Sequence, residues 1–247
     1  MEHENRFKIL NAAQLKILAM ALMLCDHLWA TLFPYHQCLT NIGRMAFPIF
    51  AFQLVEGYFC TRNFRAYLKR MFLFALISEI PFNLMTAGGL INPFQQNVMF
   101  TFCLGLLLIR FLDSRKGKKP AAYFLTAACT CLMGYFLGTI TFVDYYGYGI
   151  LMILAFYLFR NLPHGWLGIL LSMILINQGL MEGLSYPVTL FGMTFYLEQQ
   201  SFAILALIPI FMYNGKRGYH SKAFQYFSYA FYPAHMLILS LIWLAVA

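Results

Sequence analysis

Apolar stretches long enough to cross a membrane recur along the whole chain, separated by short polar segments. A helix that spans a bilayer needs about 20 predominantly apolar residues, and the pattern predicts nine such helices. They lie at residues 15–33, 41–60, 67–85, 98–112, 121–140, 145–160, 164–182, 199–213 and 226–246. Residues 183–198 are also apolar, but Gly and Pro interrupt them. The sequence leaves open whether that stretch forms a loop or a re-entrant segment.

The composition supports a membrane protein. Of the 247 residues, 61% are hydrophobic and only 11% are charged, and the mean hydropathy is +0.67. An average soluble domain has roughly 25% charged residues, so a soluble fold could not cover its surface with so few. Lipid as the solvent removes this contradiction. We therefore predict one all-α domain over residues 1–247, a polytopic helical bundle in contact with the lipid bilayer.

The distribution of the basic residues predicts the orientation. The net charge is +8, but the basic residues recur between apolar segments, which argues against a nucleic-acid-binding patch. Connections 34–40, 86–97, 141–144 and 183–198 contain no Lys or Arg. By the positive-inside rule the N-terminus is cytoplasmic, and the protein is expected in the cytoplasmic (inner) membrane as a multi-pass protein. The basic residues of the predicted cytoplasmic connections are Arg6, Lys8, Arg62, Arg65, Arg115, Lys116, Lys118, Lys119, Arg160, Lys216, Arg217 and Lys222.

Two ionisable residues share one face of the first predicted helix. A charge at mid-membrane costs about 2.5–3.5 kcal/mol on insertion scales, so each one needs a reason. Lys16 and His27 are eleven positions apart, which places them within about 20° of the same face and roughly 16 Å apart along the axis. An elongated ligand with a phosphate head and a reactive tip, such as acyl-coenzyme A, would contact both. His27 is then a candidate general base.

Asp26, next to His27, does not face it on a helix. Its carboxylate is expected to orient another group or to pair with Arg44, which is alternatively an interfacial anchor. An orienting partner for His27 is expected from another span, with Glu79 as a candidate. The structural alternative is that Asp26 and His27 hold helices together through hydrogen bonds.

Further polar residues lie in or beside the predicted spans. Glu56 is expected within reach of Lys16 or Arg70, as an ion pair or as a ligand contact. Two pairs of residues four apart each share a helix face near the predicted outer side; they are Glu79 with Asn83, and Asn97 with Thr101. His235 lies in the last span, where a buried structural histidine is the alternative. The cysteines show no CxxC spacing, and no metal site is expected.

Several blocks of the chain resemble the TraX family, the F-pilin acetylase family. They are LKILAMALMLCDHL (15–28), NIGRMAFPIFAFQLVEGY (41–58), YLKRMFLFALISEIPFN (67–83), NVMFTFCLG (97–105) and YAFYPAHMLIL (229–239). The family is regarded as part of a superfamily of transmembrane acyltransferases that includes the acyltransferase-3 and heparan glucosaminide acetyltransferase types. The resemblance implies acetyl transfer from cytoplasmic acetyl-coenzyme A, and in the namesake the acceptor is the N-terminal amine of a pilin subunit. Trp29 departs from the pattern, because a small residue is expected there.

The spacing of Lys16 and His27 matches the Arg or Lys that many acyltransferase-3 proteins have before a His in the first span, and the other candidate residues are assigned roles around that pair. His27 would be the general base, with Asp26 and Glu79 as its catalytic neighbours. Lys16 would bind the phosphates of the coenzyme, with Arg70, Glu56 and His235 as further contacts of the donor. The acceptor would be a peptide or a glycan, met by residues on the outer side, namely Arg44, Asn83, Asn97 and Thr101.

Two other classes of protein fit the same residues. A proton-coupled transporter of a small solute would use Asp26, His27 and Glu79 as a proton relay. A non-catalytic assembly factor would need neither Lys16 nor His27. The sequence does not determine the acceptor, the acyl chain length or the oligomeric state, for which a homodimer is one option. It also leaves open whether an acyl-His27 intermediate forms or the acyl group passes directly to the acceptor.

Overall fold

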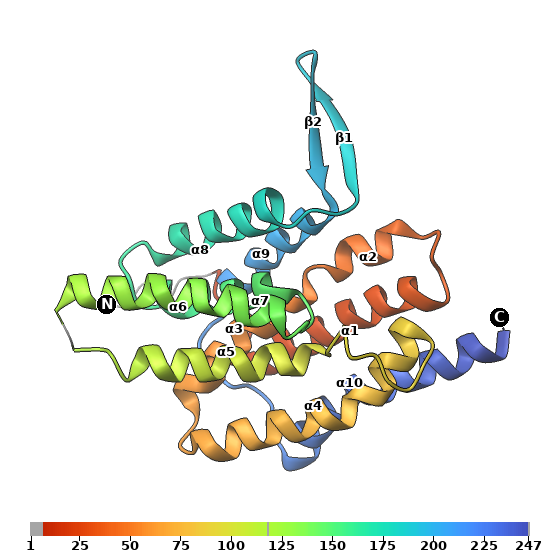
Figure 1. Ribbon diagram of the computed structural model, residues 1–247, viewed down its shortest axis with the longest axis horizontal. Helices are drawn as coiled ribbons and strands as arrows, with labels where there is room; N and C mark the ends of the chain where they lie inside the picture. The colour runs from red at the N-terminus through yellow and green to blue at the C-terminus, as the bar shows by residue number, and fades with distance from the viewer. Residues whose placement is uncertain (1–6, 118, 247) are drawn as a thin grey trace. The chain divides into compact units, whose positions relative to one another are not determined.

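The computed structural model describes residues 7–117 and 119–246 and is mostly helical, as predicted. Each of the nine apolar segments predicted from the sequence contains helix. Two residues used for the orientation, Arg6 and Lys118, lie outside the described residues. Figure 1 shows the order of the elements along the chain.

The chain folds into two compact units. The first combines the residues up to Gln53 with those from Met173 onward, and the second runs from Leu54 to Ser172. Helices α3 (Ala46–Cys60) and α8 (Gly165–Ile174) each begin in one unit and end in the other. Both units lie inside the region that the sequence analysis treats as a single domain.

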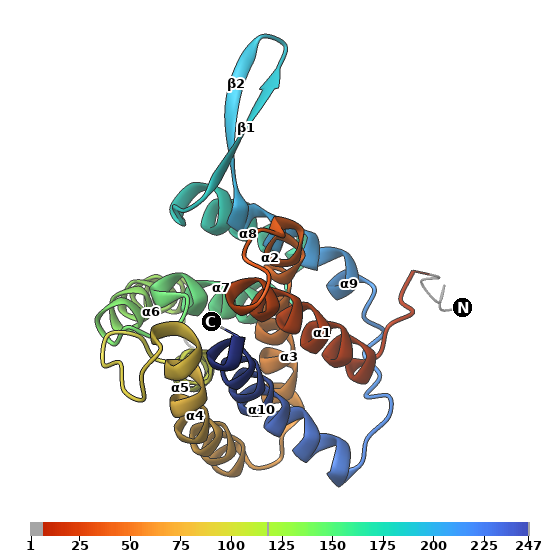
Figure 2. The ribbon, with the colours of Figure 1, turned by 90° about the vertical axis from the view of Figure 1, so that its right-hand side faces the viewer.

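Two long helices of the first unit, α1 (Ala12–Thr31) and α10 (Lys222–Val246), lie side by side and run in the same direction (Figure 2). α1 begins at a capping box, in which the side chain of Asn11 accepts from the backbone N–H of Gln14 and the side chain of Gln14 accepts from that of Asn11. These bonds satisfy two backbone donors that a helix start leaves unpaired. The start of α1 is thereby fixed four residues before Lys16.

Shorter helical elements complete the first unit. The span predicted at 41–60 is divided, because α2 ends at Gly43 and α3 begins at Ala46. α1 and α2 approach closely at Gly43, where an added Cβ would lie 2.5 Å from the Cβ of Asp26. Only glycine allows this approach. The elements are α2 (Gln37–Gly43), the π-helical η1 (Leu175–Leu180), the 3₁₀ helix η2 (Gln199–Ala206) and α9 (Leu207–Phe211).

Residues 183–198, which the sequence left open, contain a two-stranded antiparallel hairpin. It consists of β1 (Ser185–Leu190) and β2 (Met193–Glu198), and it extends away from the helices of its own unit (Figure 1). Phe191 and Gly192 form its turn with φ of 50° and 78°, as expected for a tight hairpin. The prediction of an all-α chain is therefore correct for most of the chain and wrong here, because β-branched and aromatic residues flanking a turn favour strands.

The second unit contains four longer helices. α6 and α7 form a tight antiparallel pair whose approach depends on glycines in both helices. A Cβ on Gly138 would lie 2.7 Å from the carbonyl oxygen of Tyr146, and one on Gly147 would lie 2.3 Å from that of Tyr135. The helices are α4 (Phe64–Ala87), α5 (Val98–Asp113), α6 (Pro120–Ile140) and α7 (Tyr146–Phe159).

Five helical stretches among the described residues are long and apolar enough to cross a membrane. They are α1, Gln37–Cys60, α4, α6 and α10, and shorter apolar helices lie at Tyr146–Phe159, Gly165–Leu180 and Gln199–Phe211. Large apolar side chains stay exposed along them, for example Phe124 (76%) and Ile140 (68%) on α6. Such a surface suits lipid and not water.

Candidate active site

The predicted shared face of Lys16 and His27 is the face of α1 that contacts α10. The ammonium of Lys16 lies 5.9 Å from the ring centroid of Phe224, and the imidazole of His27 contacts that of His235. Both contacts join residues 208 positions apart. Because the difference in residue number between contacting residues is the same at both contacts, eleven residues apart, the two helices run parallel and in register for about 16 Å.

The two histidines are hydrogen-bonded and stacked. His27 Nδ1 lies 2.6 Å from His235 Nε2, and the rings are 4.8 Å apart with 9° between their planes. His235 Nδ1 lies 2.6 Å from the backbone oxygen of Phe231, which can only accept a hydrogen bond. Neutral His235 therefore carries its proton on Nδ1 and accepts at Nε2. It follows that neutral His27 donates from Nδ1 and keeps the lone pair of its Nε2 for another partner.

Asp26 pairs with Arg44, as the sequence analysis anticipated. Arg44 Nη2 lies 3.2 Å from Asp26 Oδ1, and Thr40 donates to the same oxygen at 2.7 Å. Arg44 also donates to the hydroxyl of Thr40 at 2.8 Å. These contacts neutralise a carboxylate inside an apolar helix and tie α2 to α1 one residue before His27.

Lys16 lies at a basic end of the first unit. The loop after α9 covers the start of α1, because Ala12 N–H donates to the oxygen of Lys216 at 2.9 Å and Ala13 N–H to that of Arg217 at 3.2 Å. Leu10 and Tyr213 form a parallel bridge beside them. The charge of Arg217 lies near enough to act on that of Lys16. Two like charges at one helix end form a place where an anion is favoured.

Glu56 has a different partner from the ones the sequence suggested. It forms a two-point ion pair with Arg160, with Arg160 Nε 2.5 Å from Oε1 and Nη2 3.1 Å from Oε2. The expectation of contact with Lys16 or Arg70 is replaced by this pair inside the second unit. Arg70 lies in α4 and buries its Nε without a hydrogen-bond acceptor among the described residues.

The two predicted pairs, Glu79 with Asn83 and Asn97 with Thr101, belong to the second unit, whereas Arg44 belongs to the first. Asn97 caps α5 by accepting from Met99 N–H at 3.1 Å, and its side-chain nitrogen donates to Glu79 at 2.5 Å. Thr101 donates to the backbone oxygen of Asp144 at 2.7 Å. Asn83 donates to the oxygen of Leu90 at 3.3 Å. The structure thus brings Glu79 and Asn97 together, whereas Asn83 and Thr101 each make a separate contact.

A network of uncharged side chains at the base of the hairpin was missed in the sequence. The hydroxyl of Tyr186 and the side-chain nitrogen of Gln199 both donate to Asn41 Oδ1 at 3.0 Å. Asn41 follows Thr40, the partner of Asp26, so the hairpin is anchored next to the Asp26–Arg44 pair. A neutral amide costs less to insert into a membrane than a charge does, so Asn41 and Gln199 did not stand out in the sequence. Nothing in the sequence pattern distinguishes them from other polar residues near the ends of helices.

Trp29, the departure from the family pattern, lies two residues beyond His27. Its indole nitrogen is buried and has no acceptor among the residues that the structure describes. A buried N–H without a partner is rare.

The fold and these contacts define a multi-pass helical membrane protein in which a half-buried histidine, His27, pairs with a buried one, His235. The chain belongs to the TraX family, because the family model described as TraX protein matches residues 11–243. It is also 30% identical over 261 residues to the probable fimbrial assembly protein FimC, serogroup H1, of Dichelobacter nodosus, a match that covers 93% of this chain and 94% of that protein. No solved structure matches the chain.

Proposed function

We propose that this protein is a membrane-bound acyltransferase that moves an acetyl group from cytoplasmic acetyl-coenzyme A to an amine or hydroxyl of an exported acceptor. The observation that carries the proposal is the hydrogen-bond chain from the Phe231 carbonyl through His235 to His27. This chain leaves the Nε2 lone pair of His27 for the proton of an attacking nucleophile, which is what general base catalysis requires.

The reaction follows from that arrangement. The acceptor's nitrogen or oxygen attacks the thioester carbonyl while His27 Nε2 takes its proton. His235 Nε2 continues to accept from His27 Nδ1–H, and so holds the ring in place as it becomes positively charged. The tetrahedral intermediate then expels the thiolate of coenzyme A, which receives the proton from His27. The acyl group passes directly to the acceptor, and no outside oxidant or metal is needed.

Lys16 and Arg217 would hold the phosphates of the donor. They lie at the end of α1 that the charge pattern places in the cytoplasm, and Lys16 shares with His27 the face that contacts α10. A donor bound there would reach about 16 Å along α1 to the base. The acceptor would approach from the other side, so that acetyl-coenzyme A need not cross the membrane.

The parallel course of α1 and α10 supports the proposed topology. If each predicted segment crosses once, the first and last spans run parallel only when the total number of spans is odd. The bridge between Leu10 and Tyr213 likewise requires an even number of crossings between these residues. Nine spans satisfy both conditions. The cytoplasmic N-terminus and the location in the inner membrane are proposed from the distribution of basic residues alone.

The curated relative suggests the setting. That protein's name refers to fimbrial assembly, and we propose a subunit of such an assembly as the acceptor, with a glycan as the alternative. Membership of the wider transmembrane acyltransferase superfamily is part of the same proposal. The hydrogen bonds of Glu79, Asn97 and Thr101 account for their burial without a ligand, and the proposed chemistry does not need them.

Calorimetry on purified protein, followed by transfer of labelled acetyl in membrane vesicles, tests the proposal. Lys16→Ala should weaken binding of acetyl-coenzyme A roughly tenfold or more, since a hydrogen bond to a charged group contributes about 1.5–3 kcal/mol. His27→Ala should bind the donor but transfer no acetyl group. Lys69→Ala and His36→Ala are matched controls, because both residues are exposed. Normal transfer by a stably folded His27→Ala protein would exclude the mechanism.

The relative's name also favours a second candidate, a non-catalytic assembly factor. In that case Lys16→Ala and His27→Ala would leave assembly intact, and acetyl-coenzyme A would not bind. A proton-coupled carrier would instead move solute across proteoliposomes without consuming acetyl-coenzyme A.

A further inference from the structure

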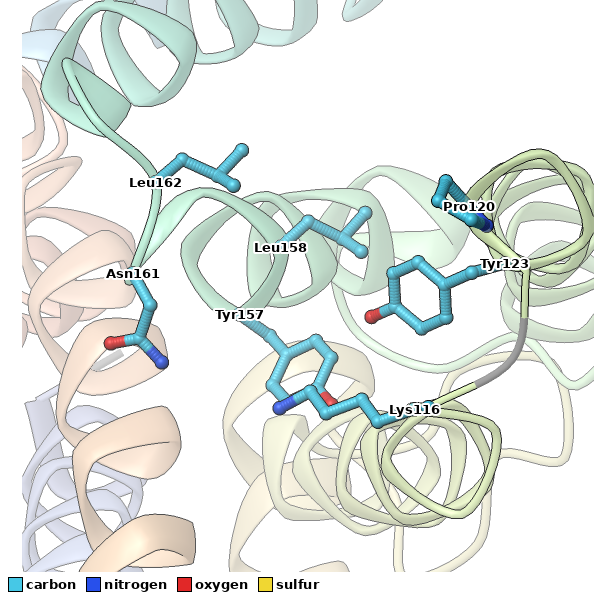
Figure 3. Close-up of a pocket in the computed structure, with 8 residues that line it drawn as sticks. Lys116, Pro120, Tyr123, Tyr157, Leu158, Asn161 and Leu162 are labelled. Atoms are coloured by element: carbon cyan, nitrogen blue, oxygen red, sulfur yellow. The ribbon is translucent and has the colours of Figure 1, made fainter.

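A cavity opens in the second unit where the loop after α5 meets the end of α7 (Figure 3). Its volume is about 280 Å³. Its walls include two tyrosines, two leucines, a lysine and an asparagine, namely Lys116, Tyr123, Tyr157, Leu158, Asn161 and Leu162. The loop and the end of α7 both belong to the side that the charge pattern places in the cytoplasm.

The ammonium of Lys116 is held at the cavity wall. It lies 2.9 Å from Asp113 Oδ1 and 4.7 Å from the ring centroid of Tyr157. Asp113 is fixed in turn, since it accepts from the hydroxyl of Tyr58 at 2.9 Å and from that of Tyr157 at 3.1 Å. A cation positioned in this way loses little side-chain entropy when it meets an anion.

Asn161 supplies a second donor. Arg160 Nη1 donates to Asn161 Oδ1 at 3.0 Å, and Arg160 is itself held by the Glu56 carboxylate. The amide oxygen is therefore occupied, and the amide nitrogen lies on the side of Lys116 and Tyr157 (Figure 3). The hydroxyl of Tyr123 points into the same space. The donors at this wall are therefore the ammonium of Lys116 and the amide nitrogen of Asn161.

Positive charge dominates the surroundings. The helix ends and loop segments that form the cavity carry five described basic residues, which are Arg110, Arg115, Lys116, Lys119 and Arg160. The nearby carboxylates, Asp113 and Glu56, are already paired with Lys116 and Arg160. The remaining field attracts anions.

The opposite wall is apolar and continues into exposed apolar surface. Leu158 and Leu162 line it, and Leu162 is 53% exposed. Trp166 follows at the start of α8 and is also 53% exposed. Tryptophan is enriched where a membrane protein meets the headgroup level of the bilayer. The cavity therefore combines fixed donors on one side with a surface for hydrocarbon on the other.

We propose that this cavity binds a phosphate group through Lys116 and Asn161. A phosphate offers several acceptor oxygens and a charge that suits an ammonium together with amide donors. It can be carried by an anionic phospholipid, whose chains would follow Leu158 and Leu162, or by a nucleotide such as coenzyme A. The apolar wall favours the lipid. The site does not rest on the proposed acyl transfer, because none of its residues belongs to the unit that holds His27.

Two probes distinguish the sources, both used with the full chain in phosphatidylcholine nanodiscs. The lipid probe is phosphatidylglycerol, scored by its retention in native mass spectrometry. The soluble probe is adenosine 3′,5′-bisphosphate, scored by calorimetry. Lys116→Gln and Asn161→Leu are compared with wild type, and Lys69→Gln is the control because it removes an exposed charge of α4 outside the cavity. Melting temperatures verify the fold of each variant.

The expected result is that wild type binds one probe and that each cavity variant binds it at least fivefold more weakly, while the control changes less than twofold. Retention of phosphatidylglycerol identifies the lipid as the source, and binding of the bisphosphate identifies a nucleotide. If Lys116→Gln fails to fold, Asn161→Leu decides, because Asn161 is exposed. The proposal is overturned if neither probe binds wild type, or if the folded cavity variants bind as the control does.

Discussion

His27 and His235 lie 2.6 Å apart between Nδ1 and Nε2, although 208 residues separate them in the chain. The contact assigns His235 a position beside the proposed base, where the sequence had suggested a contact with the donor. In the proposed mechanism His235 is therefore a positioning residue, whose side chain acts through His27. The tautomers of both rings follow from the single carbonyl of Phe231 at the end of the chain of hydrogen bonds.

Replacing His235 should reduce catalysis without affecting donor binding. His235→Leu removes the acceptor of His27 Nδ1–H, and we expect the turnover of acetyl transfer to fall by roughly a hundredfold at an unchanged KM for acetyl-coenzyme A. His235→Gln offers a carbonyl acceptor and should retain more activity than His235→Leu. Steady-state kinetics of the two variants provide the measurement. Equal losses in both, or a loss confined to KM, would contradict a positioning role.

Breaking the Asp26–Arg44 pair should destabilise the contact between α1 and α2. Arg44→Met leaves the Asp26 carboxylate with the hydroxyl of Thr40 but without a cation, and we expect a loss of roughly 2–4 kcal/mol. In the double variant Asp26→Asn/Arg44→Met no charge is stranded, so its loss should be smaller than the sum of the losses of Asp26→Asn and Arg44→Met. Unfolding titrations of the protein in detergent micelles would measure the cycle. Additive losses would mean that the 3.2 Å pair contributes no coupling.

Adding one methyl group at Gly147 should destabilise α6 and α7. The new Cβ would lie 2.3 Å from the backbone oxygen of Tyr135, and backbone cannot move aside as a flexible side chain can. We expect Gly147→Ala to cost about 1–3 kcal/mol, as overpacked sites do. Gly89→Ala is the matched control, since nothing lies within 4 Å of its added Cβ. A melting temperature for Gly147→Ala equal to that of the control would refute the close approach.

The Asp113 cluster should lose its contribution to stability in acid. Burial by itself would raise the pKa of Asp113, but hydrogen bonds from Lys116, Tyr58 and Tyr157 and the charge of Lys116 outweigh it and hold the pKa below its ordinary value. A carboxyl whose pKa is lowered in the folded state stabilises the fold above its unfolded-state pKa, about 3.9. This contribution is lost as the pH falls below that value through the lower folded-state pKa.

Melting curves of wild type and Asp113→Asn between pH 7 and pH 2 would test this dependence. The wild type should melt at the higher temperature near neutral pH, and the difference should shrink once the pH passes below about 4. A difference that stays constant down to pH 2 would show that ionised Asp113 does not stabilise the cluster.

The apolar segments determined much of the helical architecture of this protein from the sequence alone, whereas the orientation predicted from the positive charge stays a prediction. The length of an apolar run and the charge of its flanks are local properties, and lipid requires helices wherever such runs cross it. Helical periodicity also placed Lys16 and His27 on one face, and the structure confirmed that both contact α10. The Asp26–Arg44 pair could likewise be anticipated from the sequence. The apolar segments contain few charged residues, so the Asp26 carboxylate has few basic side chains with which it can pair.

Only the tertiary structure decided which partner each polar side chain found. A period of 3.6 residues gives the face of a helix but not the neighbour that covers it, so His235 could not be assigned to His27, nor Arg160 to Glu56. The sequence left residues 183–198 open between a loop and a re-entrant segment because Gly and Pro interrupt the apolar run, and only the structure showed the strands. A hydrogen bond or ion pair forms within about 3 Å, and that distance is set by how helices far apart in the chain come to lie together.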